Sequence, residues 1–368
     1  MLTKRQLKLV KAELLCYGLE LDNKAYIELL KRNPYVMNRT LVHAMHIDIN
    51  GIIINVCVSE KFCRLSPYCM TFNNGDFILL KNHKEISIVK IIDDPFWAKE
   101  RIGEYIIGDY LRPHSYECIS CSPILQCGYQ EKKKTCQFCS LNEYASHANI
   151  NKRISPKLLA KMMSKVLTHK DYEINFSSGT DLTKDKSANY YISVLQELKP
   201  FNLKNSPYIS LEITPPDKDY YIETLIDNGI TALIMNIEIA DEKLRRKICP
   251  GKSEVSINRY FEAMQKAVCL LGPGRVSSVL IAGIQPTEDI IKMSKNLIEI
   301  GVIPTIMPFK PLDDCAMRNY SITNPQELLF ISDLLESELF NAGLNPCKQN
   351  GCTKCGGCSL ETIGFIKT

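Results

Sequence analysis

Three cysteines lie close together in the stretch CGYQEKKKTCQFCS, residues 127–140. They are Cys127, Cys136 and Cys139, with eight residues between the first two and two residues between the last pair. Cysteine thiolates hold iron–sulfur clusters, and three of them on one loop can bind three irons of a cubane cluster while the fourth iron stays open to an outside ligand. A structural zinc ion instead takes a fourth protein ligand. The candidates for that ligand are Cys118, Cys121 and His147.

A second cysteine group lies near the end of the sequence, in CKQNGCTKCGGCS. Its members are Cys347, Cys352, Cys355 and Cys358. Short spacings with glycine allow the backbone to wrap around a cluster and to offer its N–H groups to sulfur. We therefore expect a second [4Fe-4S] cluster here. The alternatives are a zinc site of four thiolates, and cysteines that serve in sulfur transfer or stay free. Cys315 is another candidate for the fourth ligand, in place of Cys347.

The composition is that of a globular protein, with 45% hydrophobic residues among 368. The N-terminal stretch MLTKRQLKLVKAELL has helical spacing and lacks the continuous apolar segment of a signal peptide. No uncharged apolar run reaches the ~18 residues that a membrane span needs. These features predict a cytoplasmic protein without a membrane partner. In such a compartment the 16 cysteines would be reduced, so the clustered ones are expected to be metal ligands.

Residues 1–115 have the pattern of a small α+β domain. A first helix is predicted over residues 3–16, and runs of β-branched residues predict strands at 43–49, 51–59, 76–82 and 86–92. Asn50-Gly51 and Asn73-Asn74-Gly75 are typical turns of an antiparallel sheet. A further helix is predicted over residues 98–111, leading toward the first cysteine loop.

From about residue 117 strands and helices alternate six times. The predicted strands are 118–126, 172–178, 208–214, 231–239, 276–284 and 302–308. They are near-continuous apolar runs, as in a parallel sheet covered by helices. The series predicts an α/β fold with a partial (β/α)6 TIM-like barrel over residues 116–343 and a cysteine-rich extension over residues 344–368. Loops after the carboxyl ends of the strands carry the chemistry in such folds, and the first cysteine loop is in that position.

The cysteine loop and the (β/α)6 pattern together resemble the radical S-adenosylmethionine (SAM) superfamily over residues 117–345. The commonest motif of that family is Cys-x3-Cys-x2-Cys, with an aromatic residue just before the last cysteine. Cys136, Phe138 and Cys139 match it, whereas the eight-residue first gap departs from it. Wider first gaps occur in some branches, and the chain is most similar to the biotin-synthase-like branch.

The resemblance also implies where SAM binds. The stretch FSSGT, at the end of the second predicted strand, stands where the family has a glycine-rich turn against the amino group of SAM. This assigns Ser178, Gly179 and Thr180 to cofactor binding. Glu212, near the end of the third strand, is placed to meet the ribose or the methionyl group, and Gly283 to lie against the adenine.

One expected cofactor ligand is replaced in this sequence. Where the biotin-synthase-like branch typically has an arginine for the SAM carboxylate, this chain has Cys249. If a basic residue takes that role, the candidates are Arg245, Arg246 and Lys252, although the two arginines also suit a solvated helix face.

The resemblance implies an enzyme in which a [4Fe-4S] cluster with an open iron cleaves SAM to a 5′-deoxyadenosyl radical. That radical would abstract hydrogen from a small-molecule or carrier-bound substrate, with sulfur insertion or rearrangement in cofactor or metabolite biosynthesis among the outcomes. A flavodoxin- or ferredoxin-like electron donor is the implied partner, and the exposed run Lys132-Lys133-Lys134 is a candidate docking site for it. The sequence assigns no catalytic residue acting on the substrate.

Two other functions fit the cysteines. The first is a zinc-binding structural protein that presents the N-terminal domain to RNA or to a partner protein. The second is an iron–sulfur carrier without SAM chemistry. The formal net charge of +4, from 45 basic and 41 acidic residues, counts against a dedicated nucleic-acid binder.

Overall fold

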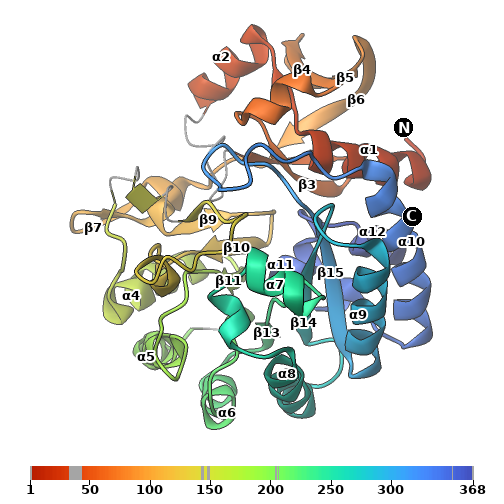
Figure 1. Cartoon of the computed structure of the whole chain (residues 1–368). Helices are drawn as coiled ribbons and strands as arrows, with labels where there is room; N and C mark the ends of the chain where they lie inside the picture. Colours follow the sequence, from red (N-terminus) through yellow and green to blue (C-terminus); the bar gives the residue numbers. More distant parts are fainter. Residues whose placement is uncertain are drawn as a thin grey trace.

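The computed structural model describes residues 2–32, 44–141, 145–146, 150–203, 205, 207–349 and 351–366. In them an N-terminal sheet lies beside a larger curled sheet that is flanked by helices (Figure 1). The N-terminal elements are α1 (Lys4–Tyr17), β1 (Glu20–Leu21), α2 (Asn23–Arg32), β2 (Ala44–Ile49), β3 (Ile52–Cys57), β4 (Tyr68–Asn73), β5 (Asp76–Lys81) and β6 (Lys84–Ile91). The helix predicted over residues 3–16 is thus confirmed as α1, capped by the Thr3 side chain.

The N-terminal sheet has the strand order β1-β4-β5-β6-β2-β3, and its hairpins are antiparallel as predicted. Asn50 and Gly51 join β2 to β3 with φ of 53° and 85°, and Asn74 and Gly75 join β4 to β5 with φ of 52° and 93°. Two consecutive positive φ angles match the twist of a tight hairpin, and Asn-Gly adopts them at low cost. The sequence pattern missed β4. The predicted strand 43–49 begins outside the described residues.

The helix predicted over residues 98–111 is wrong. The chain there forms a hairpin of β7 (Arg101–Ile102) and β8 (Tyr105–Ile106), and then β9 (Leu111–Pro113). Gly103 turns the hairpin with a φ of 61°, a left-handed conformation that ends a helix. Gly108 lies directly against the backbone of Ala98, where a Cβ would be 2.6 Å from the carbonyl oxygen.

The large sheet has the order β15-β14-β13-β12-β11-β10-β9. Its main strands are β10 (Cys118–Cys121), β11 (Glu173–Phe176), β12 (Ile209–Glu212), β13 (Ala232–Ile234), β14 (Val276–Ala282) and β15 (Val302–Pro308). Each of these pairs in parallel with the next along the chain, while β9 adds an antiparallel edge to β10. Parallel strands in sequence order confirm the predicted partial (β/α)6 barrel.

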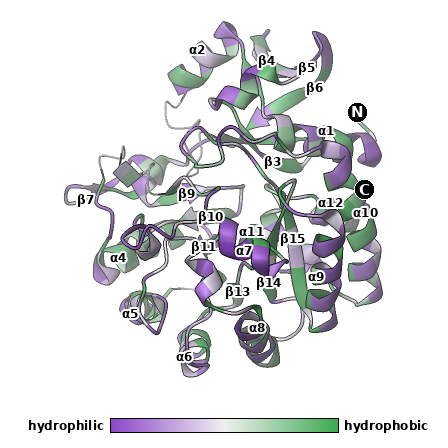
Figure 2. Cartoon of the chain, viewed as in Figure 1, coloured by the Kyte–Doolittle hydropathy of each residue, from purple (hydrophilic) through white to green (hydrophobic). Residues whose placement is uncertain are grey.

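The helices after these strands surround the outside of the sheet (Figure 1). They are α4 (Pro156–Leu167), α5 (Ala188–Leu198), α6 (Tyr220–Asp227), α8 (Ile257–Leu271), α9 (Thr287–Glu299) and α10 (Pro325–Asn341). The short α7 (Glu242–Ile248) lies instead in front of the strands, near the centre of the view in Figure 1. Most of the outer helices bury an apolar face against the strands. Helix α7 is one of the most hydrophilic elements of the chain (Figure 2). The described residues contain no helix long and apolar enough to cross a membrane.

The C-terminal segment packs back against the barrel strands. Helix α11 (Gly351–Cys355) contacts β10, β11 and β12, and α12 (Glu361–Phe365) contacts α10. The hydroxyls of Thr353 and Ser277 on β14 are 3.1 Å apart, and the Glu361 carboxylate accepts the Ile306 N–H of β15 at 3.1 Å. Helix α1 packs on α10, so both ends of the chain meet on one side of the barrel (Figure 1).

Candidate functional site

The first cysteine loop follows β10 and is fixed to two other loops at the carboxyl ends of the strands. The N–H of Gly128 donates to the Thr180 carbonyl, and that of Gly179 donates to the Ile124 carbonyl, both at 2.9 Å. Farther along, the N–H of Gln137 donates to the Ile248 carbonyl at 2.8 Å. The loop is therefore held by β11 on one side and by the segment after α7 on the other.

Gly179 permits this close approach. A Cβ at this position would lie 2.5 Å from the Gln126 carbonyl oxygen and 2.9 Å from the Cα of Cys127, which is too close for any side chain. The two other residues predicted for this turn also face the loops. The Ser178 hydroxyl accepts the Ile124 N–H at 3.2 Å, and the Thr180 and Thr214 hydroxyls are 3.2 Å apart.

The three thiols of the loop are neighbours at this edge of the barrel. Cys127 and Cys136 are half-buried, and Cys139 reaches solvent. Although part of Cys139 reaches solvent, the surrounding protein desolvates its thiol; this desolvation, followed by the charges of Cys136 and Cys127, raises the pKa of Cys139. The thiols are thus within electrostatic range of one another, as ligands of one cluster would be.

A fourth thiol reaches this site from another loop. A hydrogen bond with Cys249, together with burial, raises the pKa of Cys136 well above its usual value. Cys249 follows α7 and is fully buried. From the sequence it was interpreted only as occupying the place of an arginine, because nothing local shows that it meets a residue more than a hundred positions earlier.

Buried polar side chains line the barrel next to the thiols. The Glu212 carboxylate accepts hydrogen bonds from the Ser177 hydroxyl and the Asn236 amide, both at 2.8 Å. Burial raises the pKa of Glu212, although the charge of Lys252 and these two donors favour its ionised form. A carboxylate in this position can accept hydrogen bonds from the hydroxyl or amino groups of a ligand.

Lys252 and Glu238 form a buried ion pair of 2.7 Å in the same region. Desolvation lowers the pKa of Lys252, but the charges of Glu238, Tyr260 and Cys136 outweigh it and hold that pKa well above its usual value. Lys252 is therefore a permanent cation beside the cysteine loop. Glu238 has a φ of 67°, and a non-glycine residue in this conformation frequently marks a functional site.

Arg245 has a structural environment. Its guanidinium donates to the backbone carbonyls of Ile237, Lys252 and Val255 at 2.9–3.2 Å and lies over the Tyr260 ring. Arg245 therefore positions the segment that carries Cys249 and Lys252. Arg246 is largely exposed and pairs with Glu242 on its own helix.

Gly283 lies near the end of β14, where its φ is 89°. A Cβ there would be 2.3 Å from the Thr323 hydroxyl. The positive φ and the packing against Thr323 each require glycine at this position.

Three members of the second cysteine group are neighbours. Desolvation, followed by the charges of Cys358 and Cys355, raises the pKa of Cys352. Cys347 stands apart, with its Sγ 3.5 Å from the Thr362 carbonyl oxygen. Cys315 lies in an apolar cluster with Phe309 and Met317, and no thiol of the second group is among the groups whose charges act on it.

Neither cysteine group resembles a site for a single ion. In the described part of the chain, no three His, Cys, Asp or Glu side chains converge tightly enough to hold one metal ion. A cubane cluster takes one thiolate per iron, so its ligands surround a volume rather than converge on a point. His147, a candidate zinc ligand, lies outside the described residues.

Comparisons with known proteins give distant likenesses. No protein-family model matches the chain. A bacteriochlorophyllide c C-7(1)-hydroxylase from Chlorobaculum limnaeum is 25% identical over 131 residues, which are 35% of this chain and 33% of that protein. The match thus spans about a third of the length of this curated relative.

Similar solved structures include the FeFe-hydrogenase maturase HydG from Carboxydothermus hydrogenoformans, methylornithine synthase (PylB) and a radical SAM methyltransferase from Sphaerobacter thermophilus. In that order the TM-scores are 0.47, 0.48 and 0.46, and the identities are 16%, 18% and 11%. The alignments cover 60%, 67% and 80% of this chain and 51%, 68% and 81% of the three structures. A radical SAM enzyme is thus among these structures, while nothing singles out the biotin-synthase-like branch.

We predict that Arg245→Met destabilises the protein far more than the same change at its neighbour. The substitution removes three hydrogen bonds that a buried guanidinium donates, so the free energy of unfolding should fall by about 3 kcal/mol. Arg246→Met removes one exposed pair within a helix and should cost less than about 0.5 kcal/mol. Denaturant unfolding followed by circular dichroism measures both values. Equal losses would show that Arg245 does not hold this segment.

Proposed function

We propose that the protein is a radical SAM enzyme whose first cluster is held by Cys127, Cys136 and Cys139. The observation that carries the proposal is the position of these three thiols. They share one loop after the first parallel strand, at the carboxyl edge where such barrels do their chemistry. A [4Fe-4S] cluster with SAM, when bound, supplies the one-electron cleavage that yields a 5′-deoxyadenosyl radical.

The chain's own residues position the cofactor. The backbone of Ser178, Gly179 and Thr180 lies against the cysteine loop and offers polar groups to the amino end of SAM. Glu212 provides a carboxylate for a ribose hydroxyl or the methionyl amino group. Lys252 provides the positive charge for the SAM carboxylate, because Arg245 is engaged with the backbone and Arg246 points to solvent.

We place the substrate in the barrel, between the two cysteine groups. Glu212 lies in the network beside the first loop, and its charge also raises the pKa of Cys352 in the second group. The polar side chains between them would hold a small-molecule or carrier-bound substrate and exclude water from it. The second group would hold another [4Fe-4S] cluster, which suits sulfur insertion or electron relay.

The loop also provides a docking surface for the electron donor. Lys132 and Lys133 are exposed on the segment between Cys127 and Cys136, and Lys134 pairs with Glu254 at 2.6 Å. Cations this close to the thiols would attract the acidic face of a flavodoxin- or ferredoxin-like protein.

One observation favours a second candidate function. Because Cys249 lies in hydrogen-bonding contact with Cys136, four thiols could close around the first cluster and leave no iron open for SAM. The protein would then be an iron–sulfur carrier or electron-transfer protein without SAM chemistry.

The test of the proposal is metal content after anaerobic reconstitution, with and without SAM. We expect about eight irons per chain in the wild type and about four when Cys127, Cys136 and Cys139 are all replaced by alanine. Electron paramagnetic resonance should show a SAM-dependent shift in the wild type and none in the triple variant. Stoichiometric zinc in place of iron and sulfide would refute the proposal and support the zinc-binding protein.

Cys249→Ser separates the two candidates. If SAM occupies the open iron, this variant should keep the iron content and the SAM-dependent spectral shift of the wild type. If Cys249 is the fourth ligand, the variant should lose iron or gain a SAM response that the wild type lacks. The same reconstituted samples and spectra decide between them.

Lys252→Met should weaken SAM binding without emptying the cluster site. Loss of a charged hydrogen bond to the SAM carboxylate is expected to raise the dissociation constant about tenfold or more. Lys252→Arg keeps the charge and should recover part of the affinity, while Arg246→Met should leave it unchanged. Equilibrium dialysis of the reconstituted proteins gives these constants, and unchanged affinity in Lys252→Met would exclude Lys252 from SAM binding.

A further inference from the structure

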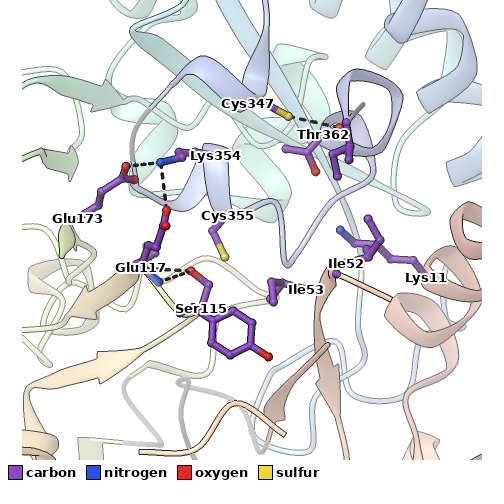
Figure 3. Close-up of a pocket in the computed structure, with 14 residues that line it drawn as sticks. Lys11, Ile52, Ile53, Ser115, Glu117, Glu173, Cys347, Lys354, Cys355 and Thr362 are labelled. Atoms are coloured by element: carbon purple, nitrogen blue, oxygen red, sulfur yellow. Dashed lines mark hydrogen bonds and ion pairs between the residues drawn. The ribbon is translucent and has the colours of Figure 1, made fainter. Parts of the chain in front are cut away.

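The second cysteine group shares its cavity with a strand of the barrel. A cavity of about 300 Å³ lies between α1, β3, β10 and the C-terminal segment (Figure 3). Cys355 and Cys347 of the C-terminal segment line it, and so does Cys118, the first residue of β10. The sequence offered Cys118 only as a ligand for the first loop, whereas the structure places it beside the second group.

The position of Cys118 follows from how α11 is anchored. The Gly351 N–H donates to the Glu173 carboxylate at 2.8 Å, and Lys354 pairs with the same carboxylate at 2.6 Å. Glu173 is the direct neighbour of Cys118 in the pairing of β10 with β11. Gly351 packs so closely on Ser210 that a Cβ would lie 2.1 Å from its hydroxyl. These contacts hold α11 against the first residue of β10, which is Cys118.

Cys118 contacts the thiols of this helix directly. The Cys118 and Cys355 side chains are in hydrogen-bonding contact and line the same cavity. The charge of Cys352 also acts on Cys118, and the charges of Cys355 and Cys358 act on Cys352. Cys118 therefore has Cys355 and Cys352 as neighbours, and Cys352 in turn lies near Cys358.

Cys347 has different neighbours. Its sulfur is directed toward the Thr362 carbonyl, away from Cys355 (Figure 3). Cys347 lines the same cavity, but no thiol is among the groups whose charges act on it.

The surroundings of the four thiols suit an anionic cluster. The Asn55 amide donates to the Cys358 Sγ at 3.2 Å, and the Gly357 N–H donates to Cys355. Lys11 is buried and donates to the Gly356 carbonyl at 2.6 Å, with its charge close to Cys355 and Cys358. N–H donors and a cation around thiolate sulfurs stabilise the negative charge of such clusters and raise their reduction potential.

We infer that Cys118 is the fourth protein ligand of the second cluster, in place of Cys347. The inference rests on the proposed function, since it assumes that the C-terminal cysteines hold an iron–sulfur cluster. The site then has Cys352, Cys355 and Cys358 from the C-terminal segment and Cys118 from the barrel. Lys11 and Asn55 of the N-terminal region supply its charge compensation.

The test uses the full-length chain in which Cys127, Cys136 and Cys139 are replaced by alanine, so that only the second cluster is counted. Into this parent we would introduce Cys118→Ala, Cys347→Ala or Cys121→Ala. Cys121 is the matched control, because it lies in the same strand and, among the described residues, burial alone accounts for its raised pKa. Circular dichroism of each apoprotein checks that β10 still folds. Iron, sulfide and the paramagnetic resonance spectrum are measured after anaerobic reconstitution.

We expect Cys118→Ala to lower the iron content at least about twofold or to change the spectrum to that of a cluster with fewer irons. Cys347→Ala and Cys121→Ala should match the parent in both. Full iron with an unchanged spectrum in Cys118→Ala would overturn the inference, as would iron loss in Cys347→Ala or an equal loss in Cys121→Ala. If the parent takes up no iron and sulfide, the second cluster itself is refuted, while the first cluster is judged separately from the wild type.

Discussion

The backbone contact between the loops after β10 and β11 is the constraint on which the first site depends. Two hydrogen bonds of 2.9 Å and the missing side chain of Gly179 bring the cysteine loop against the end of β11. Parallel pairing of β10 with β11 makes this contact available, because both strands end at the same edge. The thiols, the Glu212 carboxylate and the Lys252–Glu238 pair are then assembled around one small volume.

Three carboxylates inside the barrel are each held by specific donors. Glu173 binds Lys354, Glu238 binds Lys252, and Glu212 is held by two neutral donors. Removing one partner of a buried ion pair leaves an uncompensated charge in a poorly solvated interior, which costs far more than an exposed pair contributes. These contacts fix the positions of the three carboxylates around the space in which we place the substrate.

The sequence predicted what depends on local pattern. Apolar runs predicted the strands of the barrel, and Asn50-Gly51 predicted a hairpin. Cys136 and Cys139 indicated the candidate first site. The sequence did not predict contacts between segments that are distant along the chain. Cys249 beside Cys136, Cys118 beside Cys355, and Arg245 turned to the backbone depend on how whole elements pack, and no spacing rule encodes that. The helix predicted over residues 98–111 failed for a local reason, because Gly103 adopts a left-handed turn.

The return of the C-terminal segment to the barrel has a consequence for how the protein is made. Lys11 donates a hydrogen bond to the carbonyl of Gly356, which lies 345 residues later in the sequence. Cys118, on the first parallel strand of the barrel, contacts Cys355 of the C-terminal segment. Synthesis runs from the N-terminus, so the pocket of the second cysteine group has no complete wall until residues 351–358 have been made. The first loop, in contrast, can form once the early strands have paired. The two cysteine groups would therefore be assembled in the order in which the ribosome makes their walls.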